Sequence, residues 1–135
     1  MSEKIKALIP HRYPFLFVDE ILTANKDETV ALKIFHSGEI MGNFSESNFV
    51  PGTLIFESMA QAGGAGVKQV GLTDGIFAFA TINEAQILNP VVCGEQIKMI
   101  IKNIRVSNKI ISQLGTAFVK GKVVAKAKWL CVRIG

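Results

Sequence analysis

The segment Pro51–Val70 reads PGTLIFESMAQAGGAGVKQV and is the most informative stretch for the fold of this chain. Pro51 suits the first turn of a helix, where its missing N–H costs nothing. From Thr53 to Val70 the residues are apolar nearly all round, which is typical of a buried helix. Small residues recur between Ala60 and Gly66, so a sheet could approach closely, although each glycine weakens the helix by roughly 1 kcal/mol relative to alanine. The sequence therefore predicts one central, buried helix.

The segments on either side of this helix predict an antiparallel sheet. Turn residues separate six strand-like segments, which are Phe15–Ala24, Val30–Phe35, Ile76–Leu88, Glu95–Val106, Lys109–Val119 and Lys122–Val132. The Asn108-Lys109 and Gly121-Lys122 pairs suit hairpin turns, so we expect the last three strands to form a meander. A short amphipathic helix over Ser2–Ile9, ended by Pro10, is expected at the start of the chain. This is the α+β layout, in a single domain of residues 1–135.

Composition narrows the class of protein. The chain has 135 residues, of which 49% are hydrophobic and 19% charged, so we expect a globular domain rather than a disordered chain. No stretch has the eighteen or so uncharged apolar residues of a membrane span, and the N-terminus lacks a secretory signal, so we expect a cytoplasmic protein. The net charge of +4 comes from scattered lysines, which argues against nucleic-acid binding and suits an anionic partner such as an acidic carrier protein.

The two cysteines, Cys93 and Cys131, predict no metal site. The chain has no CxxC motif and no histidine at ligand spacing from a cysteine. Neither a disulfide framework nor a zinc site is therefore supported, and we expect two buried free thiols. No cofactor is expected.

The predicted helix carries one carboxylate, Glu57, in apolar surroundings. A carboxyl group among such neighbours loses hydration, which favours its protonated form and makes it a plausible proton donor near neutral pH. Gln61 follows one turn later, at the i+4 position, and is expected to orient the Glu57 carboxylate. The loop upstream, where a partner base would be expected, offers Asn43, whose side chain cannot titrate.

Three stretches form recognisable motifs: PHRYPFLFVD at 10–19, FVPGTLIFESMAQ at 49–61 and NPVVCGEQ at 89–96. Together with residues 121–124 and 131–133, they resemble the (3R)-hydroxyacyl-acyl carrier protein dehydratases of the FabZ type over almost the whole chain. The resemblance implies a hot-dog fold, in which a sheet wraps a central helix. It also implies a dimer, often assembled three times into a hexamer, with acyl tunnels at the dimer interface.

The resemblance also implies roles for particular residues. In the family, a His from one subunit's loop acts with a Glu from the other subunit's helix, and a backbone N–H at the helix start polarises the thioester carbonyl. Glu57 matches the acid, Gly52 the helix-start amide and Gln61 the family's Gln. Asn43 stands in place of the catalytic His. Phe44, beside it, is expected to line the core or the tunnel and to contact substrate.

The replacement at Asn43 limits the chemistry that we expect. Dehydration needs a base for the carbon-bound proton and an acid for the departing hydroxyl. His11 belongs to the opening motif and His36 lies on a strand before the loop, so neither is an evident replacement for the base. We expect a dehydratase-like protein of fatty-acid or related acyl-chain synthesis, with activity that is impaired or depends on a His-bearing paralogue in a hetero-oligomer.

Two other functions fit the same residues. Hot-dog thioesterases use a helix carboxylate and a backbone oxyanion site without histidine, so Glu57 could serve an acyl-thioester hydrolase. A non-catalytic acyl-carrier binding subunit is the third hypothesis. In each case the ligand is an acyl thioester on acyl carrier protein or CoA. The family commonly has basic residues in the stretch ARFKRPVVPG, whereas this chain has AQILNP at 85–90, which does not favour the usual docking of a carrier protein there.

Overall fold

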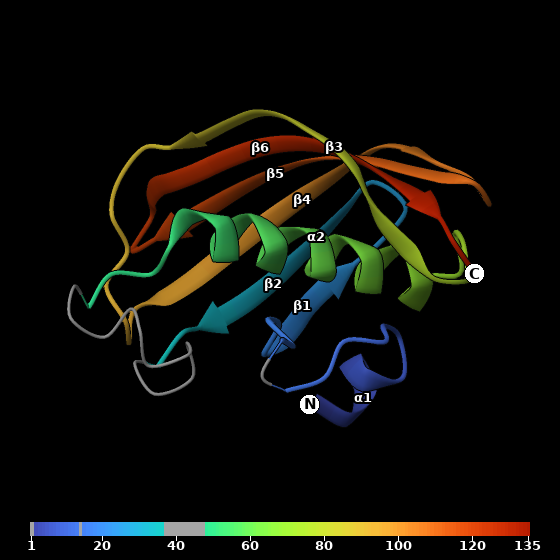
Figure 1. Cartoon of the computed structure of the whole chain (residues 1–135). Coiled ribbons are helices and arrows are strands. Elements are labelled where there is room, and N and C mark those ends of the chain that lie inside the picture. Colours follow the sequence, from blue (N-terminus) through green and yellow to red (C-terminus); the bar gives the residue numbers. More distant parts are fainter. Residues whose placement is uncertain (1, 14, 37–47) are drawn as a thin grey trace.

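The computed structural model of the chain describes residues 2–13, 15–36 and 48–135. Within them, one six-stranded antiparallel sheet curves around one long helix (Figure 1). The strand order in the sheet is β1-β2-β4-β5-β6-β3. The elements in chain order are α1 Ser2–Lys6, β1 Glu20–Ala24, β2 Glu28–Ile34, α2 Gly52–Gln69, β3 Phe77–Ile87, β4 Gln96–Val106, β5 Ile110–Val119 and β6 Lys122–Arg133. This arrangement confirms the predicted α+β class and the central helix.

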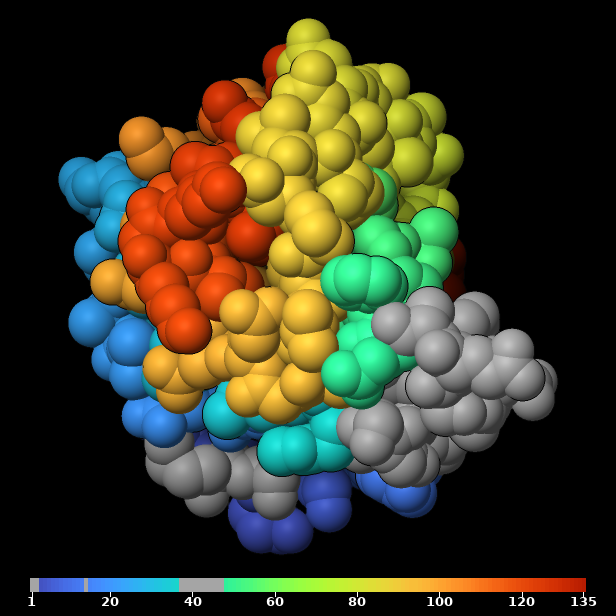
Figure 2. Space-filling view, turned by 90° about the vertical axis from the view of Figure 1, so that its left-hand side faces the viewer, coloured from blue at the N-terminus to red at the C-terminus, as the bar shows by residue number. Residues whose placement is uncertain are grey.

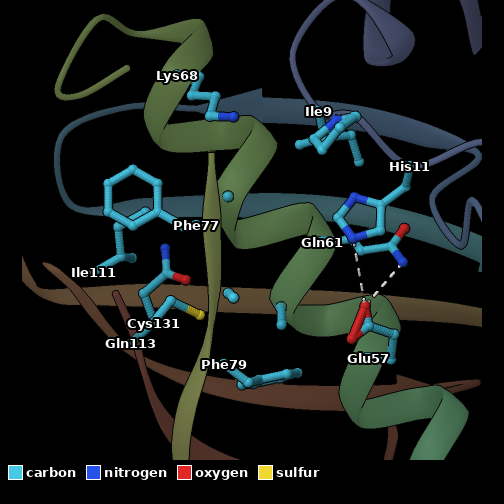
Figure 3. A pocket seen from close by; sticks show the side chains of 14 residues that line it. Ile9, His11, Glu57, Gln61, Lys68, Phe77, Phe79, Ile111, Gln113 and Cys131 are labelled. Carbon is cyan, nitrogen blue, oxygen red and sulfur yellow. Dashed lines mark hydrogen bonds and ion pairs between the residues drawn. The ribbon is translucent and has the colours of Figure 1, made fainter. Parts of the chain in front are cut away.

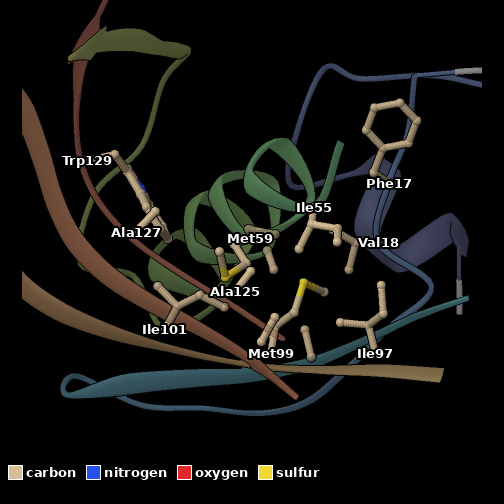
Figure 4. Close-up of a cluster of buried hydrophobic side chains, with 14 of the residues drawn as sticks. Phe17, Val18, Ile55, Met59, Ile97, Met99, Ile101, Ala125, Ala127 and Trp129 are labelled. Carbon is tan, nitrogen blue, oxygen red and sulfur yellow. The ribbon is translucent and has the colours of Figure 1, made fainter. Parts of the chain in front are cut away.

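The hydrophobic core lies between α2 and the concave face of the sheet (Figure 4). On the helix side, Ile55 and Met59 are fully buried, and on β4 the alternate residues Ile97, Met99 and Ile101 face them. Each such side chain contributes about 1.5–3 kcal/mol by leaving water. The buried side chains of β4, two residues apart, and those of α2, four residues apart, therefore pack together in one core.

Two glycines of α2 allow the sheet to approach the helix. A methyl group added at Gly66 would overlap the side chain of Thr29 on β2, and one added at Gly63 would overlap the amide of Gln113 on β5. Gln113 is itself fixed, because it accepts a hydrogen bond of 3.1 Å from the Trp129 indole and donates one of 3.2 Å to the Gly63 carbonyl. The small residues thus permit close packing, as the sequence predicted.

The predicted strand over Phe15–Ala24 was wrong in its first half. Only Glu20–Ala24 pairs as a strand, with β2 as its antiparallel neighbour. The backbone of Phe15 and Phe17 bonds to the side chain of Gln61 instead of to a neighbouring strand. The first helix is also shorter than predicted and ends at Lys6.

The four later strands match the predictions to within one or two residues, and β4, β5 and β6 form the predicted meander. The β5–β6 turn falls on Lys120-Gly121, one residue earlier than expected. Both residues have positive φ, 52° and 78°, as a two-residue type I′ hairpin turn requires. No helix among the described residues is long and apolar enough to span a membrane.

The start of α2 is held against the segment that joins β3 to β4. Val50 donates a backbone hydrogen bond of 2.8 Å to Val91, and Cys93 donates one of 3.0 Å to Asn48. Figure 2 shows this end of the molecule, where the beginning of α2 (green) lies beside the end of β3 and the β3–β4 connection (yellow). These backbone bonds fix where the helix begins.

Gly66→Ala is expected to lower the free energy of unfolding by about 1–3 kcal/mol, because the added methyl overlaps the buried Thr29 side chain. The matched control is Gly64→Ala on the same helix, whose added methyl meets no atom within 4 Å. In the control, the helix propensity of alanine raises stability by up to about 1 kcal/mol. Urea denaturation at one protein concentration measures both, and equal effects of the two variants would contradict this packing.

Candidate active site

Glu57 faces a cavity of about 250 Å³ between α2, the N-terminal segment and β3 (Figure 3). The helix contributes one stripe of lining residues at helical spacing, which are Glu57, Ala60, Gln61, Gly64 and Lys68. Opposite them lie His11 from the N-terminal segment, and Phe77 and Phe79 from β3. The cavity therefore combines apolar walls with a few converging polar groups, as ligand sites commonly do.

The side chain of Gln61 fixes the Glu57 carboxylate. Its Nε2 donates hydrogen bonds of 2.9 Å to Glu57 Oε2 and of 2.9 Å to the Phe15 carbonyl, while its Oε1 accepts one of 2.8 Å from the Phe17 N–H. Gln61 is only 3% exposed, so these bonds are shielded from water. The amide thus ties one helix turn, the carboxylate and the N-terminal segment together.

His11 lies beside Glu57, which sequence reasoning missed. Its Nε2 is 3.9 Å from Glu57 Oε2, and its Nδ1 is buried with no hydrogen-bond partner among the described residues. Burial lowers the pKa of His11 from its ordinary value of 6.5, Glu57 opposes this shift, and Lys68 and Arg12 add to it. In the sequence, His11 stands out only as part of the opening motif at 10–19, and that motif does not indicate that its side chain lines a cavity with Glu57.

Arg12 holds the segment that carries His11. Its guanidinium donates hydrogen bonds to three backbone carbonyls, those of Lys6 (3.1 Å), Ile9 (2.9 Å) and His11 itself (2.7 Å). Ile5 and Ile9, on the same segment, are 2% and 5% exposed and belong to the core. Apolar anchoring and these three bonds together set the position of the His11 ring.

The surroundings of Glu57 differ from those expected. Its side chain is 32% exposed in the single chain, not buried among apolar neighbours. Ile55 and Met59 are close in sequence, but they point to the sheet on the opposite face of the helix. The carboxylate instead faces the cavity, where Gln61 and His11 are its polar neighbours.

A second hollow adjoins the first. It measures about 460 Å³, and its walls are mainly apolar groups of α2 and β3, including Phe56 and Ile82. Glu57 and Phe79 line both hollows, so the carboxylate lies where they meet. An extended ligand with an apolar chain would therefore pass the carboxylate.

Two further titratable groups line the cavity, Cys131 and Lys68. Burial raises the pKa of the Cys131 thiol to about 11, with a further contribution from Glu57, so the reactive thiolate is scarce at neutral pH. Burial lowers the pKa of Lys68, and Asp74 partly opposes that shift. Both cysteines are free thiols, as predicted, although Cys93 is only half-buried.

The remaining residues of interest lie elsewhere. Gly52 begins α2 and is not among the residues that line these two hollows. His36 is exposed just after β2 and does not line them either. Asn43 and Phe44 lie outside the described residues. Among the described residues, no group of three or more His, Cys, Asp and Glu side chains is arranged to hold a metal ion.

A curved antiparallel sheet around one helix is the hot-dog fold, and solved structures share it with this chain. The dehydratase heterocomplex ApeI:P of Xenorhabdus doucetiae matches with a TM-score of 0.80 at 14% identity, over 97% of this chain and 91% of that one. A hypothetical thioesterase of Streptococcus pneumoniae, solved with coenzyme A, matches with a TM-score of 0.68 at 13% identity, over 99% and 94%. These similarities confirm the fold that the motifs implied.

Sequence comparison identifies the family. The model of the FabA-like domain matches residues 9–128. The chain is 38% identical to the 3-hydroxyacyl-[acyl-carrier-protein] dehydratase FabZ of Haemophilus influenzae over 137 residues, 98% of this chain and 93% of the relative. It is 35% identical to the FabZ of Solibacter usitatus over 132 residues, 95% and 82%. The chain therefore belongs to the FabA-like family, and its predicted resemblance to the FabZ dehydratases is confirmed.

Gln61→Met is expected to lower the free energy of unfolding by about 1–3 kcal/mol, because the buried Phe17 N–H loses its acceptor. Glu57→Gln is the matched control. It keeps an oxygen that accepts from Gln61 at a partly exposed position, so its effect stays within about 0.5 kcal/mol. Urea denaturation compares them, and a Gln61→Met variant as stable as the control would show that these bonds are not important for the fold.

Proposed function

We propose that this chain is a 3-hydroxyacyl-thioester dehydratase that takes acyl groups carried on acyl carrier protein or CoA. One observation carries the proposal: Glu57, at the position of the family's acid, faces a cavity and has its carboxylate fixed by Gln61. Identity of 38% to a FabZ dehydratase over nearly the whole chain supports it. The apolar walls of the two adjoining hollows suit an acyl chain.

In this proposal Glu57 supplies the proton that the departing hydroxyl needs. Gly52, at the start of α2, supplies a backbone N–H to the thioester carbonyl, because the first amides of a helix have no partner within it. Polarising that carbonyl acidifies the neighbouring carbon, from which a base then removes a proton. Gln61 keeps the carboxylate in position between the two hollows.

Asn43 cannot take a proton, so unless another group of this chain acts as the base, activity is impaired or depends on a partner. Phe44 is proposed to line the acyl site. A hetero-oligomer with a His-bearing paralogue would supply the missing group, and the fold relative from Xenorhabdus is itself a dehydratase heterocomplex. We place this activity in the cytoplasm.

Glu57→Gln is expected to lower the rate of dehydration about a hundred- to ten-thousandfold, because glutamine cannot donate a proton to the hydroxyl. The assay follows formation of the enoyl thioester from a 3-hydroxybutyryl thioester by the purified chain. Glu3→Gln is the control, because Glu3 is an exposed carboxylate on α1 with 87% of its side chain accessible.

Simultaneous thiol detection separates the alternatives. Release of free thiol that depends on Glu57, without enoyl product, would identify a thioester hydrolase and refute the dehydratase. Binding of the thioester with neither product would identify an acyl-carrier binding subunit. Dehydration that is unchanged in Glu57→Gln would show that the acid lies elsewhere.

The chain is also expected to form a dimer through β3. This strand lies at the edge of the sheet, and its Phe79 and Ile82 side chains are 40% and 44% exposed. Long, apolar edge strands are seldom left open in soluble proteins. Light scattering should give the mass of a dimer or hexamer, and Ile82→Lys should shift it towards the monomer. The control is Ile104→Lys on β4, where the native side chain is 52% exposed; a monomeric wild type would contradict this prediction.

A further inference from the structure

We propose that His11 is the general base of this site and removes the proton from the carbon next to the thioester carbonyl. This inference rests on the proposed dehydratase function and deepens it, because it assigns the base that Asn43 cannot be. His11 and Glu57 line the same cavity from different elements of one chain (Figure 3). The site would then contain both a base and an acid without a residue from a second subunit.

The geometry fits a paired base and acid. His11 Nε2 and Glu57 Oε2 are 3.9 Å apart, so a proton can pass between them after a small approach of either side chain. Both side chains are about one third exposed, at 33% and 32%, so a substrate in the cavity can reach them. The Arg12 guanidinium holds the backbone that carries His11, and the amide of Gln61 fixes Glu57.

The charges around His11 favour its neutral, proton-accepting form. Burial lowers the pKa of His11, and the cations Lys68 on α2 and Arg12 on the same segment lower it further. Among the described residues whose charges shift the pKa of His11, Glu57 acts in the opposite direction and raises it. Cys131, which faces the cavity from β6, carries no charge at neutral pH because its pKa is raised to about 11. A neutral imidazole with a pKa below 6.5 is available as a base at neutral pH.

The chemical step balances within the pair. The C–H bond breaks and its proton goes to His11 Nε2, while its electron pair forms the new double bond. The C–O bond at the next carbon breaks with its pair on oxygen, and that oxygen takes the proton of Glu57 and leaves as water. The imidazolium and carboxylate that result lie 3.9 Å apart, and transfer of one proton from Nε2 to Oε2 restores both groups. No further acid, base or co-reactant is needed.

The burial of Nδ1 leaves Nε2 as the ring nitrogen that can meet a substrate. For Nε2 to accept a proton, the neutral ring must carry its hydrogen on Nδ1. Among the described residues Nδ1 has no hydrogen-bond partner, so no acceptor on that side stabilises the charged ring. The Glu57 carboxylate that forms in the same step, 3.9 Å from Nε2, is the group that stabilises it.

The test is the pH dependence of dehydration for the wild type, His11→Gln and His36→Gln. In the wild type, kcat/KM should fall as the pH drops through the His11 pKa, which lies below 6.5, because the protonated ring cannot accept a proton. His11→Gln should lower kcat/KM about a hundred- to ten-thousandfold and remove this acidic limb. His36→Gln, on an exposed residue outside the cavity, should change neither.

A structural role for His11 has a different signature. Added imidazole should restore part of the rate of His11→Ala if His11 is a base, whereas loss of rate without rescue, with the acidic limb retained, would overturn the inference. A His11→Gln variant within threefold of the wild type would overturn the base but leave the dehydratase intact. A wild type that forms no enoyl thioester would refute the dehydratase and, with it, the base.

Discussion

The side chain of Gln61 carries the hydrogen bonds on which the site depends. One buried amide accepts from the Phe17 N–H, donates to the Phe15 carbonyl and donates to Glu57. Because all three bonds come from one rigid group, the position of the carboxylate is coupled to the path of the N-terminal segment. That segment in turn brings His11 to the cavity. A single helix turn therefore links the fold to the proposed chemistry.

The helix α2 has two faces with different tasks. One face carries Ile55, Met59 and the glycines that let the sheet approach, and it forms the core. The other face, from Glu57 to Lys68, lines the cavity and is only partly covered in the single chain. The exposed apolar groups of β3 border this second face. The core contacts and most of the cavity lining thus lie on different faces of one element, and Gly64, unlike Gly66, has space around it.

The sequence predicted the fold well, because the spacing of hydrophobic residues and the residue types at turns depend only on positions close together in the chain. The strands from β3 to β6 and the limits of α2 needed no tertiary information. The predicted strand over Phe15–Asp19 was wrong, because the side chain of Gln61, distant in sequence, makes hydrogen bonds with the backbone of this segment. The prediction that Glu57 is buried among apolar side chains was wrong, because its apolar neighbours in sequence lie on the opposite face of the helix. His11 was missed because its place depends on how Arg12 and Ile9 fold the segment, which no local pattern reveals.

With Glu57 as acid and His11 as base, the purified chain should add and remove water at an acyl thioester without a second kind of subunit. Incubation of the chain with a four-carbon enoyl thioester in D₂O, followed by mass spectrometry of the products, measures this activity. The expected product is a hydrated thioester, intact at its thioester bond, with one deuterium bound to the carbon next to the carbonyl. Free thiol, or an enoyl thioester recovered unchanged, would contradict it.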